Sequence, residues 1–160
     1  MIINNINYLL LFMASRFSLI KQLISYIYTL DIPKTAIELE GYYTWMGDDG
    51  IARTRVKPNV DITLDYALAN TKVVTAFFVD KKFPILIDSR GIKSMSYEAR
   101  RHFSARGRDS KTNAFGIIIG SNISRVLGNF YLGVNKPAVP TKLFDNESEA
   151  IAWLTQFVNQ

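Results

Sequence analysis

The sequence predicts an α/β fold, with an N-terminal β-hairpin followed by alternating strands and helices. Two short, continuous apolar runs, at 84–88 and 114–120, support this prediction, as do the helical patterns on either side of them. Continuous apolar runs are typical of strands that are covered on both faces, as in parallel sheets. Strands separated by helices imply crossover connections. We therefore expect a mixed, mainly parallel sheet whose antiparallel part is the hairpin.

The size and composition are those of one globular domain. The chain has 160 residues, of which 48% are apolar and 21% charged. It contains no cysteine, which excludes disulfides and thiolate chemistry and fits a reducing cytoplasm. The net charge of +5 is modest, its basic residues are spread along the chain, and no recognised nucleic-acid motif occurs. We therefore do not expect nucleic acid as a partner.

Residues 1–33 are predicted to form an amphipathic helical extension, separate from a domain at 34–160. From Ser15 onward the spacing is helical, and Pro33 follows the end of the pattern. One face of this helix carries apolar side chains, namely Phe17, Ile20, Ile24 and Ile27. This stripe can pack on the chain's own domain, bind a partner, or lie on a membrane surface through residues 15–30, which leaves a peripheral membrane location open. A poorly ordered extension is the remaining alternative.

The same region does not predict a membrane span or a secretory signal. The apolar run at 8–13 is too short to cross a bilayer, and Arg16 and Lys21 interrupt the longer apolar stretch. No basic residue precedes the run, and no clear cleavage site closes it. We therefore expect a cytoplasmic protein.

The hairpin is predicted from two alternating segments, 37–46 and 51–58, which are separated by the turn sequence Gly-Asp-Asp-Gly. A four-residue loop would pair residue 46 with 51, 44 with 53, 42 with 55 and 40 with 57. In this register the charged side chains Arg53, Arg55 and Lys57 lie opposite the core. We interpret them as a solvated face of the hairpin rather than a ligand-binding stripe.

The remaining elements follow from apolar runs and capping residues. A helix is predicted from Thr63, its N-cap, to about residue 79, and another from near Ser96. The clearest helical pattern lies at 121–134, and a short strand at 141–144. A final helix begins with Asn146 and Glu149, which resemble a capping box. Its predicted core residues are Ala150, Trp153 or Leu154, and Phe157.

The two strand-to-helix joints contain few signals for phosphate binding. Neither has the spaced glycines of a phosphate cradle, and no GxxxxGK[ST] motif occurs. The joint at 120–125 offers weak anion-site candidates in Ser121, Asn122 and Arg125, but helix capping by Ser121 or Asn122 is the simpler interpretation.

The joint at 88–97 resembles that of the STAS, or SpoIIAA-like, domain family, and the likeness extends over residues 36–158. In anti-sigma factor antagonists of that family, a strand ends in Asp, a turn follows, and an Asp-Ser pair begins the next helix. Asp88 matches the strand end, residues 90–92 match the turn, and Ser96-Tyr97 stands where Asp-Ser is expected. The phospho-acceptor pair is therefore missing, and we expect Ser96 to cap the helix.

A closer likeness is to a group of uncharacterised bacterial SpoIIAA-like proteins. It rests on Lys57-Pro58, PILIDSRG at 84–91, Glu98-Ala99-Arg100, Gly128-Asn129-Phe130, Asn135-Lys136-Pro137 and PTKLF at 140–144. This resemblance implies the fold but brings no established activity with it.

Catalysis is not predicted. His102 is the single histidine, so that no usual transition-metal set can form, and we expect no metal and no cofactor. Asp88 and Glu98 are candidates for an acid–base pair, but a strand-end carboxylate usually binds loop N–H groups.

The leading hypothesis is a non-catalytic interaction or regulatory module that acts through the loop and helix at 88–101. The interaction candidates are Asp88, Ser89, Arg90, Gly91, Ser94, Ser96, Tyr97, Arg100 and Arg101. Its expected partner is a protein or a second copy of the chain. Arg90, Arg100, Arg101, Arg106 and Arg108 form either an electropositive rim for an acidic or phosphate-bearing partner, or a solvated face. The alternative function is binding of a lipid or small apolar ligand, suggested by 10 Phe, 8 Tyr, 2 Trp and the N-terminal stripe.

Overall fold

The computed structural model describes residues 13–20, 22–23, 31–77, 81–105, 111–120 and 138–159. The chain divides into two compact units, Met1–Lys34 and Thr35–Gln160. In the first unit, residues 13–20 and 22–23 are helical. No helix in the described part of the chain is long and apolar enough to span a membrane.

The second unit contains a six-stranded sheet in the order β1-β2-β3-β5-β7-β8. The strands are β1 (Ile37–Glu38), β2 (Tyr42–Met46), β3 (Ala52–Val56), β5 (Phe83–Asp88), β7 (Thr112–Ile118) and β8 (Thr141–Phe144). The first three strands pair antiparallel, whereas β3, β5, β7 and β8 run parallel. The predicted mixed, mainly parallel sheet is therefore confirmed.

Two further strands form a small parallel sheet of their own, β4 (Val60–Ile62) with β6 (Ile92–Met95). The sequence analysis predicted no strand in either segment. Val60 N–H donates to the carbonyl of Gly91 at 3.2 Å, and Ser96 N–H donates to the carbonyl of Ile62 at 2.9 Å. This pairing holds the segment that leads into the next helix.

Among the described residues, the helices that cover the sheet are α2 (Leu64–Ala76), α3 (Tyr97–Ala105) and α5 (Glu147–Leu154), the last continued by the 3₁₀ turn η1 (Thr155–Phe157). As predicted, Thr63 caps α2 and accepts the N–H of Tyr66 at 3.4 Å. Asn146 caps α5: its Oδ1 accepts the N–H of Glu149 at 2.9 Å, and its amide donates to Glu149 Oε1 at 2.9 Å. The predicted helix at 121–134 lies outside the described residues.

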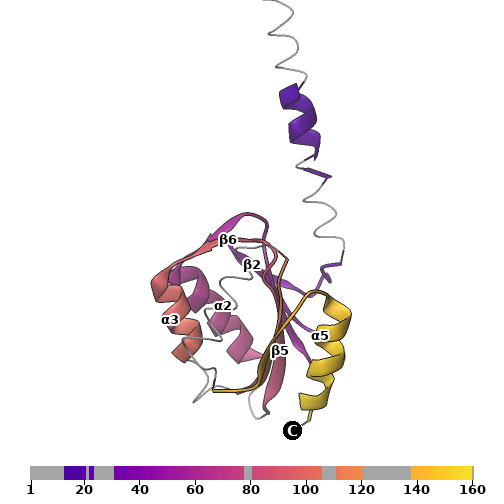
Figure 1. Ribbon diagram of the computed structural model, residues 1–160, viewed down its shortest axis with the longest axis vertical. Helices are drawn as coiled ribbons and strands as arrows, with labels where there is room; N and C mark the ends of the chain where they lie inside the picture. Colours follow the sequence, from indigo (N-terminus) through magenta and orange to yellow (C-terminus); the bar gives the residue numbers. More distant parts are fainter. Residues whose placement is uncertain are drawn as a thin grey trace, which may run out of the picture. The chain divides into compact units, whose positions relative to one another are not determined.

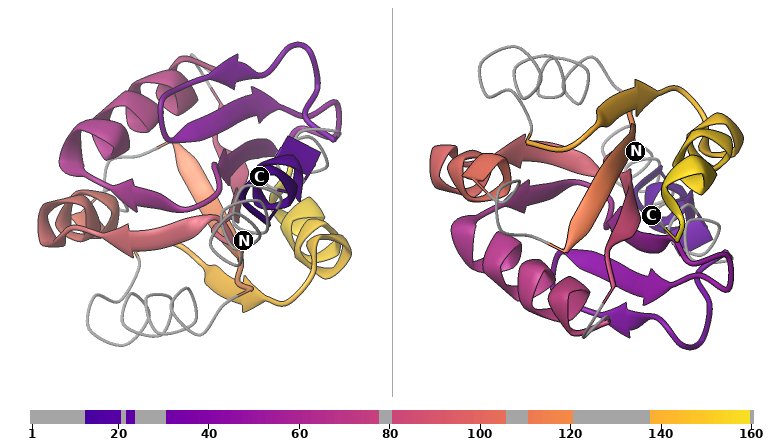
Figure 2. Two further views of the ribbon diagram at one scale, coloured as in Figure 1. Left: turned by 90° about the horizontal axis from the view of Figure 1, so that it is seen from above. Right: turned by 90° about the horizontal axis from the view of Figure 1, so that it is seen from below.

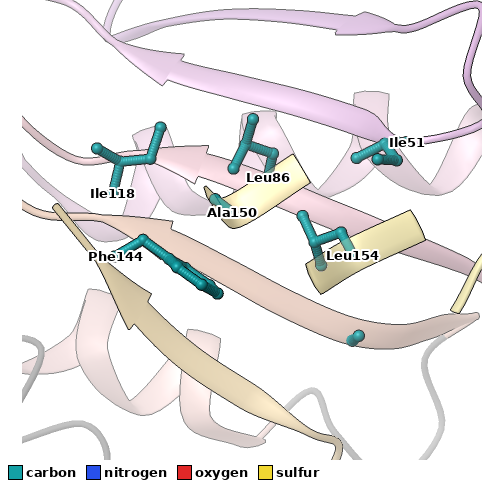
Figure 3. Close-up of a cluster of buried hydrophobic side chains, with 7 residues drawn as sticks. Ile51, Leu86, Ile118, Phe144, Ala150 and Leu154 are labelled. Carbon is teal, nitrogen blue, oxygen red and sulfur yellow. The ribbon is translucent and has the colours of Figure 1, made fainter. Parts of the chain in front are cut away.

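The helices α2 and α3 lie on one face of the sheet and α5 on the other (Figures 1 and 2). Figure 3 shows the core on the α5 side, where Ala150 and Leu154 point toward the strands. That cluster consists of Ile51, Leu86, Ala114, Ile118, Phe144, Ala150 and Leu154. Two more clusters, around Tyr42 and Phe83, lie under α2 and α3.

The hairpin register differs from the predicted one by one residue. Met46 pairs with Ala52, Thr44 with Thr54, and Tyr42 with Val56, so the turn has five residues, 47–51. The extra turn residue is Ile51, which is fully buried in the core cluster below α5. The burial of Ile51 explains the longer turn, because its side chain has to point into the core before β3 begins to pair with β2.

The shifted register overturns the prediction of a solvated arginine face. Arg53 and Arg55 share the sheet face that carries Trp45 and Tyr43, and Arg55 is only 6% exposed. Thr44 and Thr54 face α2 instead, where Asn70 Nδ2 donates to their hydroxyls at 2.8 and 3.2 Å.

Candidate functional site

Asp88 ends β5 on the α5 side of the sheet, and its buried carboxylate binds two arginines. The register pairs it with Arg55 of β3, whose Nε lies 3.2 Å from Asp88 Oδ2. Arg90 donates from Nε to Oδ1 at 2.9 Å and from a terminal nitrogen to Oδ2 at 2.7 Å. The backbone N–H of Arg90 also donates to Oδ1 at 3.2 Å, as predicted for a strand-end carboxylate.

The same network reaches helix α5. A terminal nitrogen of Arg55 lies 3.5 Å from Glu147 Oε2 in the first turn of that helix. The Arg55 guanidinium also lies 5.8 Å from the ring centroid of Trp45. Arg90, Asp88, Arg55 and Glu147 thus form one chain of charges, the Asp88 network, which joins the loop after β5 to β3 and α5. Buried charges require such partners, because their desolvation is costly.

A small hollow lies beside the Asp88 network. It is lined by Trp45, Arg53, Thr54, Arg55, Leu86, Asp88, Ile118 and Glu147, and measures about 180 Å³ including space open to solvent. Sites for small molecules are typically about 300–1,000 Å³ and mostly apolar. This charged hollow therefore does not support the alternative of an apolar ligand.

Arg53 contributes a further ion pair at the edge of the hollow. It donates to both carboxylate oxygens of Asp49, at 2.8 and 2.7 Å. These hydrogen bonds hold the pKa of Asp49 below its usual value. The pair closes the turn between β2 and β3, where Asp49 also accepts the N–H of Ile51 at 3.2 Å.

The loop at 89–91 is fixed to the sheet by its small residues. Ser89 is buried, and its Oγ donates to the carbonyl of Ile118 at 2.6 Å. Gly91 approaches β3 so closely that a Cβ there would lie 2.3 Å from the Lys57 carbonyl oxygen and 2.4 Å from that of Val56. Ser89 and Gly91, both predicted interaction residues, therefore hold the loop in place.

The next residues lie at the surface of β6. Lys93 Nζ lies 3.0 Å from Asp61 Oδ2 across the small sheet, and the Ser94 hydroxyl donates to Asp61 Oδ1. The hydrogen bond from Ser94, followed by that from Lys93, lowers the pKa of Asp61. Ser96 accepts the N–H of Ala99 at 3.1 Å, which confirms the predicted helix cap.

Helix α3 separates inward from outward side chains. Arg100 is half-buried and donates to the carbonyl of Met95, and His102 Nε2 lies 2.8 Å from the Thr71 hydroxyl on α2. Tyr97 and Arg101 point outward, with the Arg101 guanidinium 5.9 Å from the Tyr97 ring centroid. We call the exposed residues Lys93, Ser94, Tyr97 and Arg101 the β6–α3 face.

The structure thus divides the predicted interaction residues into two groups. The first group makes contacts that maintain the fold and consists of Asp88, Ser89, Arg90, Gly91, Ser96 and Arg100. Lys93, which the sequence analysis did not select, joins Ser94, Tyr97 and Arg101 at the surface.

Other site predictions cannot be placed in the same way. Arg106, Arg108, Ser121, Asn122 and Arg125 lie outside the described residues. Within the described ranges, no group of three or more His, Asp or Glu side chains could hold a metal ion.

Sequence reasoning also missed Arg55, Glu147 and Trp45. The burial of Arg55 could have been predicted only from the correct hairpin register. Glu147 carried a signal, since it is acidic and directly follows the cap of α5.

Comparisons with known proteins identify relatives without an assigned activity. The family described as a domain of unknown function (DUF7793) matches residues 44–158. A crystal structure of an uncharacterised DUF3478-family protein from Shewanella loihica PV-4, described as having a SpoIIAA-like fold, is 17% identical with a TM-score of 0.55; the match covers 74% of this chain and 97% of that one. A protein of unknown function from Arthrobacter sp. FB24 is 30% identical with a TM-score of 0.28, covering 69% of this chain and 96% of that one. No curated protein matches.

Proposed function

The chain belongs to the DUF7793 family of unknown function and has a SpoIIAA-like fold, and on that basis we propose that it is a non-catalytic interaction module. Its binding surface is the β6–α3 face, and its partner is a protein, with a second copy of the chain as one form of such a partner. We place the module in the bacterial cytoplasm, in keeping with a chain that has no cysteine.

The observation that carries this proposal is the exposure of Tyr97. Its side chain is 58% exposed, more than any other large apolar residue described in the second unit. Tyrosine and arginine are enriched among the residues that dominate binding energy at protein interfaces. Tyr97 with Arg101 beside it therefore has the composition of an interface centre.

The support beneath this face favours the same function. The capped helix α3, the β4–β6 pairing and the Gly91 contact hold the exposed side chains in a defined arrangement. A surface ordered before binding loses less conformational entropy when it binds. Exposed aromatic and basic groups on such a rigid support are suited to binding a partner.

The proposal includes no phosphorylation switch of the kind found in anti-sigma factor antagonists. The Ser96 hydroxyl caps α3. In the resemblance to those antagonists, Tyr97 falls at the position of the acceptor serine. Regulation of this module would therefore act through its partner or through another residue.

Site-specific photo-crosslinking in bacterial cells tests the proposal. A photoreactive phenylalanine analogue placed at position 97 should yield a covalent adduct with a protein. The same analogue at Ala152, which is exposed on α5 across the sheet, should not. An adduct of twice the chain's mass would identify the partner as a second copy. No adduct from position 97, or equal adducts from both positions, would refute the proposed function.

A further inference from the structure

We infer that the β6–α3 face binds an acidic segment of polypeptide, one that carries carboxylates next to an aromatic or aliphatic side chain. This inference rests on the proposed function and adds the chemistry of the partner.

The first evidence is the geometry of Tyr97 and Arg101. They are four residues apart on α3, so they share one side of the helix, and the guanidinium lies 5.9 Å from the ring centroid. The ring offers an apolar surface, while the guanidinium offers planar donors that match a carboxylate in a bidentate arrangement. A matching segment therefore needs an acidic group beside an apolar one.

The second evidence is that Arg101 is available to bind. Among the described residues it makes no ion pair, although it is exposed. The neighbouring cations are engaged: Arg90 with Asp88 at 2.7 Å, and Lys93 with Asp61 at 3.0 Å. An incoming carboxylate can therefore bind Arg101 without displacing an ion-pair partner from the described part of the chain.

The third evidence is the charge of the sequence that continues from this face. Residues 100–111 contain five basic side chains and one acidic side chain, Asp109, which gives a formal excess of four positive charges. The basic residues are Arg100, Arg101, Arg106, Arg108 and Lys111. Such an excess attracts acidic partners and speeds their association, and it does so less at high salt.

The structure also indicates where on the face the carboxylate binds. At the N-terminal end of α3, Ser96 occupies the capping position and Glu98 lies in the first turn. The negative charge of Glu98 would repel an anion at that end. The carboxylate is therefore expected beside Arg101, with the apolar side chain against the Tyr97 ring.

The test uses the full chain as bait for a phage-displayed library of random 12-residue peptides. The enriched peptides should combine Asp or Glu with an aromatic or aliphatic residue. A synthetic peptide of enriched sequence should bind at least tenfold more weakly to the Arg101→Glu and Tyr97→Ala variants. Lys72→Glu makes the same charge change at an exposed position on α2 and should alter the affinity by less than twofold. Raising the salt should weaken binding to the wild-type chain.

Several results would overturn the inference: no enrichment, enriched peptides without excess acid, or an affinity unaffected by Arg101→Glu. Both Tyr97 and Arg101 are exposed, so their variants should melt close to the wild-type temperature. If the charge reversal lowers that temperature by more than a few degrees, Arg101→Gln replaces it and should still weaken binding. Cross-links from position 97 together with peptides that lack acidic residues would refute only the acidic partner. Absence of cross-links would refute the proposed function itself.

Discussion

Replacing Asp88 by asparagine removes the negative charge that lies between Arg55 and Arg90. Breaking a buried ion pair by removing one partner costs about 3–5 kcal/mol. Two features reduce this value: Arg90 is 45% exposed and can be hydrated, and Arg55 retains Glu147 at 3.5 Å. Since Glu147 is itself 37% exposed, it compensates only in part. We expect a loss of roughly 2–4 kcal/mol in the free energy of unfolding, mostly from the lost ion pair between Asp88 and the buried Arg55.

Urea denaturation followed by circular dichroism measures this loss. Small proteins lose about 1–3 kcal/mol of stability per molar urea. With a slope in the middle of that range, about 2 kcal/mol per molar, the midpoint should fall by roughly 1–2 M while the slope stays unchanged. Asp61→Asn is the matched control, because it removes a carboxylate from an exposed pair with Lys93 and should leave the midpoint unchanged. A second variant, Asp88→Asn with Arg55→Met, should recover at least half of the loss, since no buried charge is then left without a partner.

The reasoning about the Asp88 network is wrong if Asp88→Asn unfolds at the same urea concentration as the wild type. It is also wrong if Arg55→Met destabilises the Asp88→Asn variant by as much as it destabilises the wild type. Either result would mean that solvent, and not Asp88, compensates the Arg55 charge.

Three further substitutions test other parts of the fold. Gly91→Ala should lower the free energy of unfolding, measured by urea denaturation, by at least about 2 kcal/mol, because its methyl group would lie 2.3 Å from the Lys57 carbonyl oxygen. A variant as stable as the wild type would contradict the close approach. Tyr42→Phe should raise the free energy of unfolding at pH 7 by about 1 kcal/mol, because the buried hydroxyl has no hydrogen-bond partner among the described residues; a loss of stability would reveal a partner. Burial raises the pKa of Tyr42, so the unfolded chain releases that proton first, and stability should fall as pH rises above about 10. Tyr42→Phe should make that fall shallower, as measured by denaturation between pH 7 and 11. Ser96→Ala should lower the melting temperature by the cost of a lost cap, about 1 kcal/mol, whereas Ser96→Asp should restore it.

Local patterns in the sequence were sufficient to predict most of the sheet and the helix starts. The apolar runs that became β5 and β7 have no exposed residue: β5 is buried on both faces, and β7 is buried on one face and half-buried on the other. Their composition alone therefore identifies them. Thr63, Ser96 and Asn146 cap their helices through hydrogen bonds to residues three positions later. Such short-range interactions can be read without knowledge of the tertiary structure.

The strands β4 and β6 could not be predicted in this way. They contain only three and four residues. Val60, Asp61 and Ile62 alternate over too short a stretch to indicate a strand, and in β6 the exposed Lys93 and Ser94 follow one another and interrupt the alternation. Only their pairing with each other makes them strands. Because β6 carries part of the candidate binding face, half of that surface was assigned to a loop.

The sequence predicted which segment carries the candidate site, but not what each residue of that segment does. The sequence placed Asp88, Ser89 and Tyr97 close together without indicating which of them would be buried. Which of them is buried depends on the neighbouring strand β3, because Arg55 lies beside Asp88 only in the observed register. Tertiary contacts therefore decided which residues support the fold and which remain accessible.

The length of the turn between β2 and β3 sets which side of β3 is charged. Successive side chains of a strand point to opposite faces, so deletion of a single turn residue would direct Arg53 and Arg55 toward α2 and Thr54 toward α5. Loss or gain of two residues would leave both faces as they are. Among related sequences, we therefore expect the length of this turn to differ by two residues. A difference of one residue should occur only where the basic and hydroxyl residues of β3 have exchanged positions.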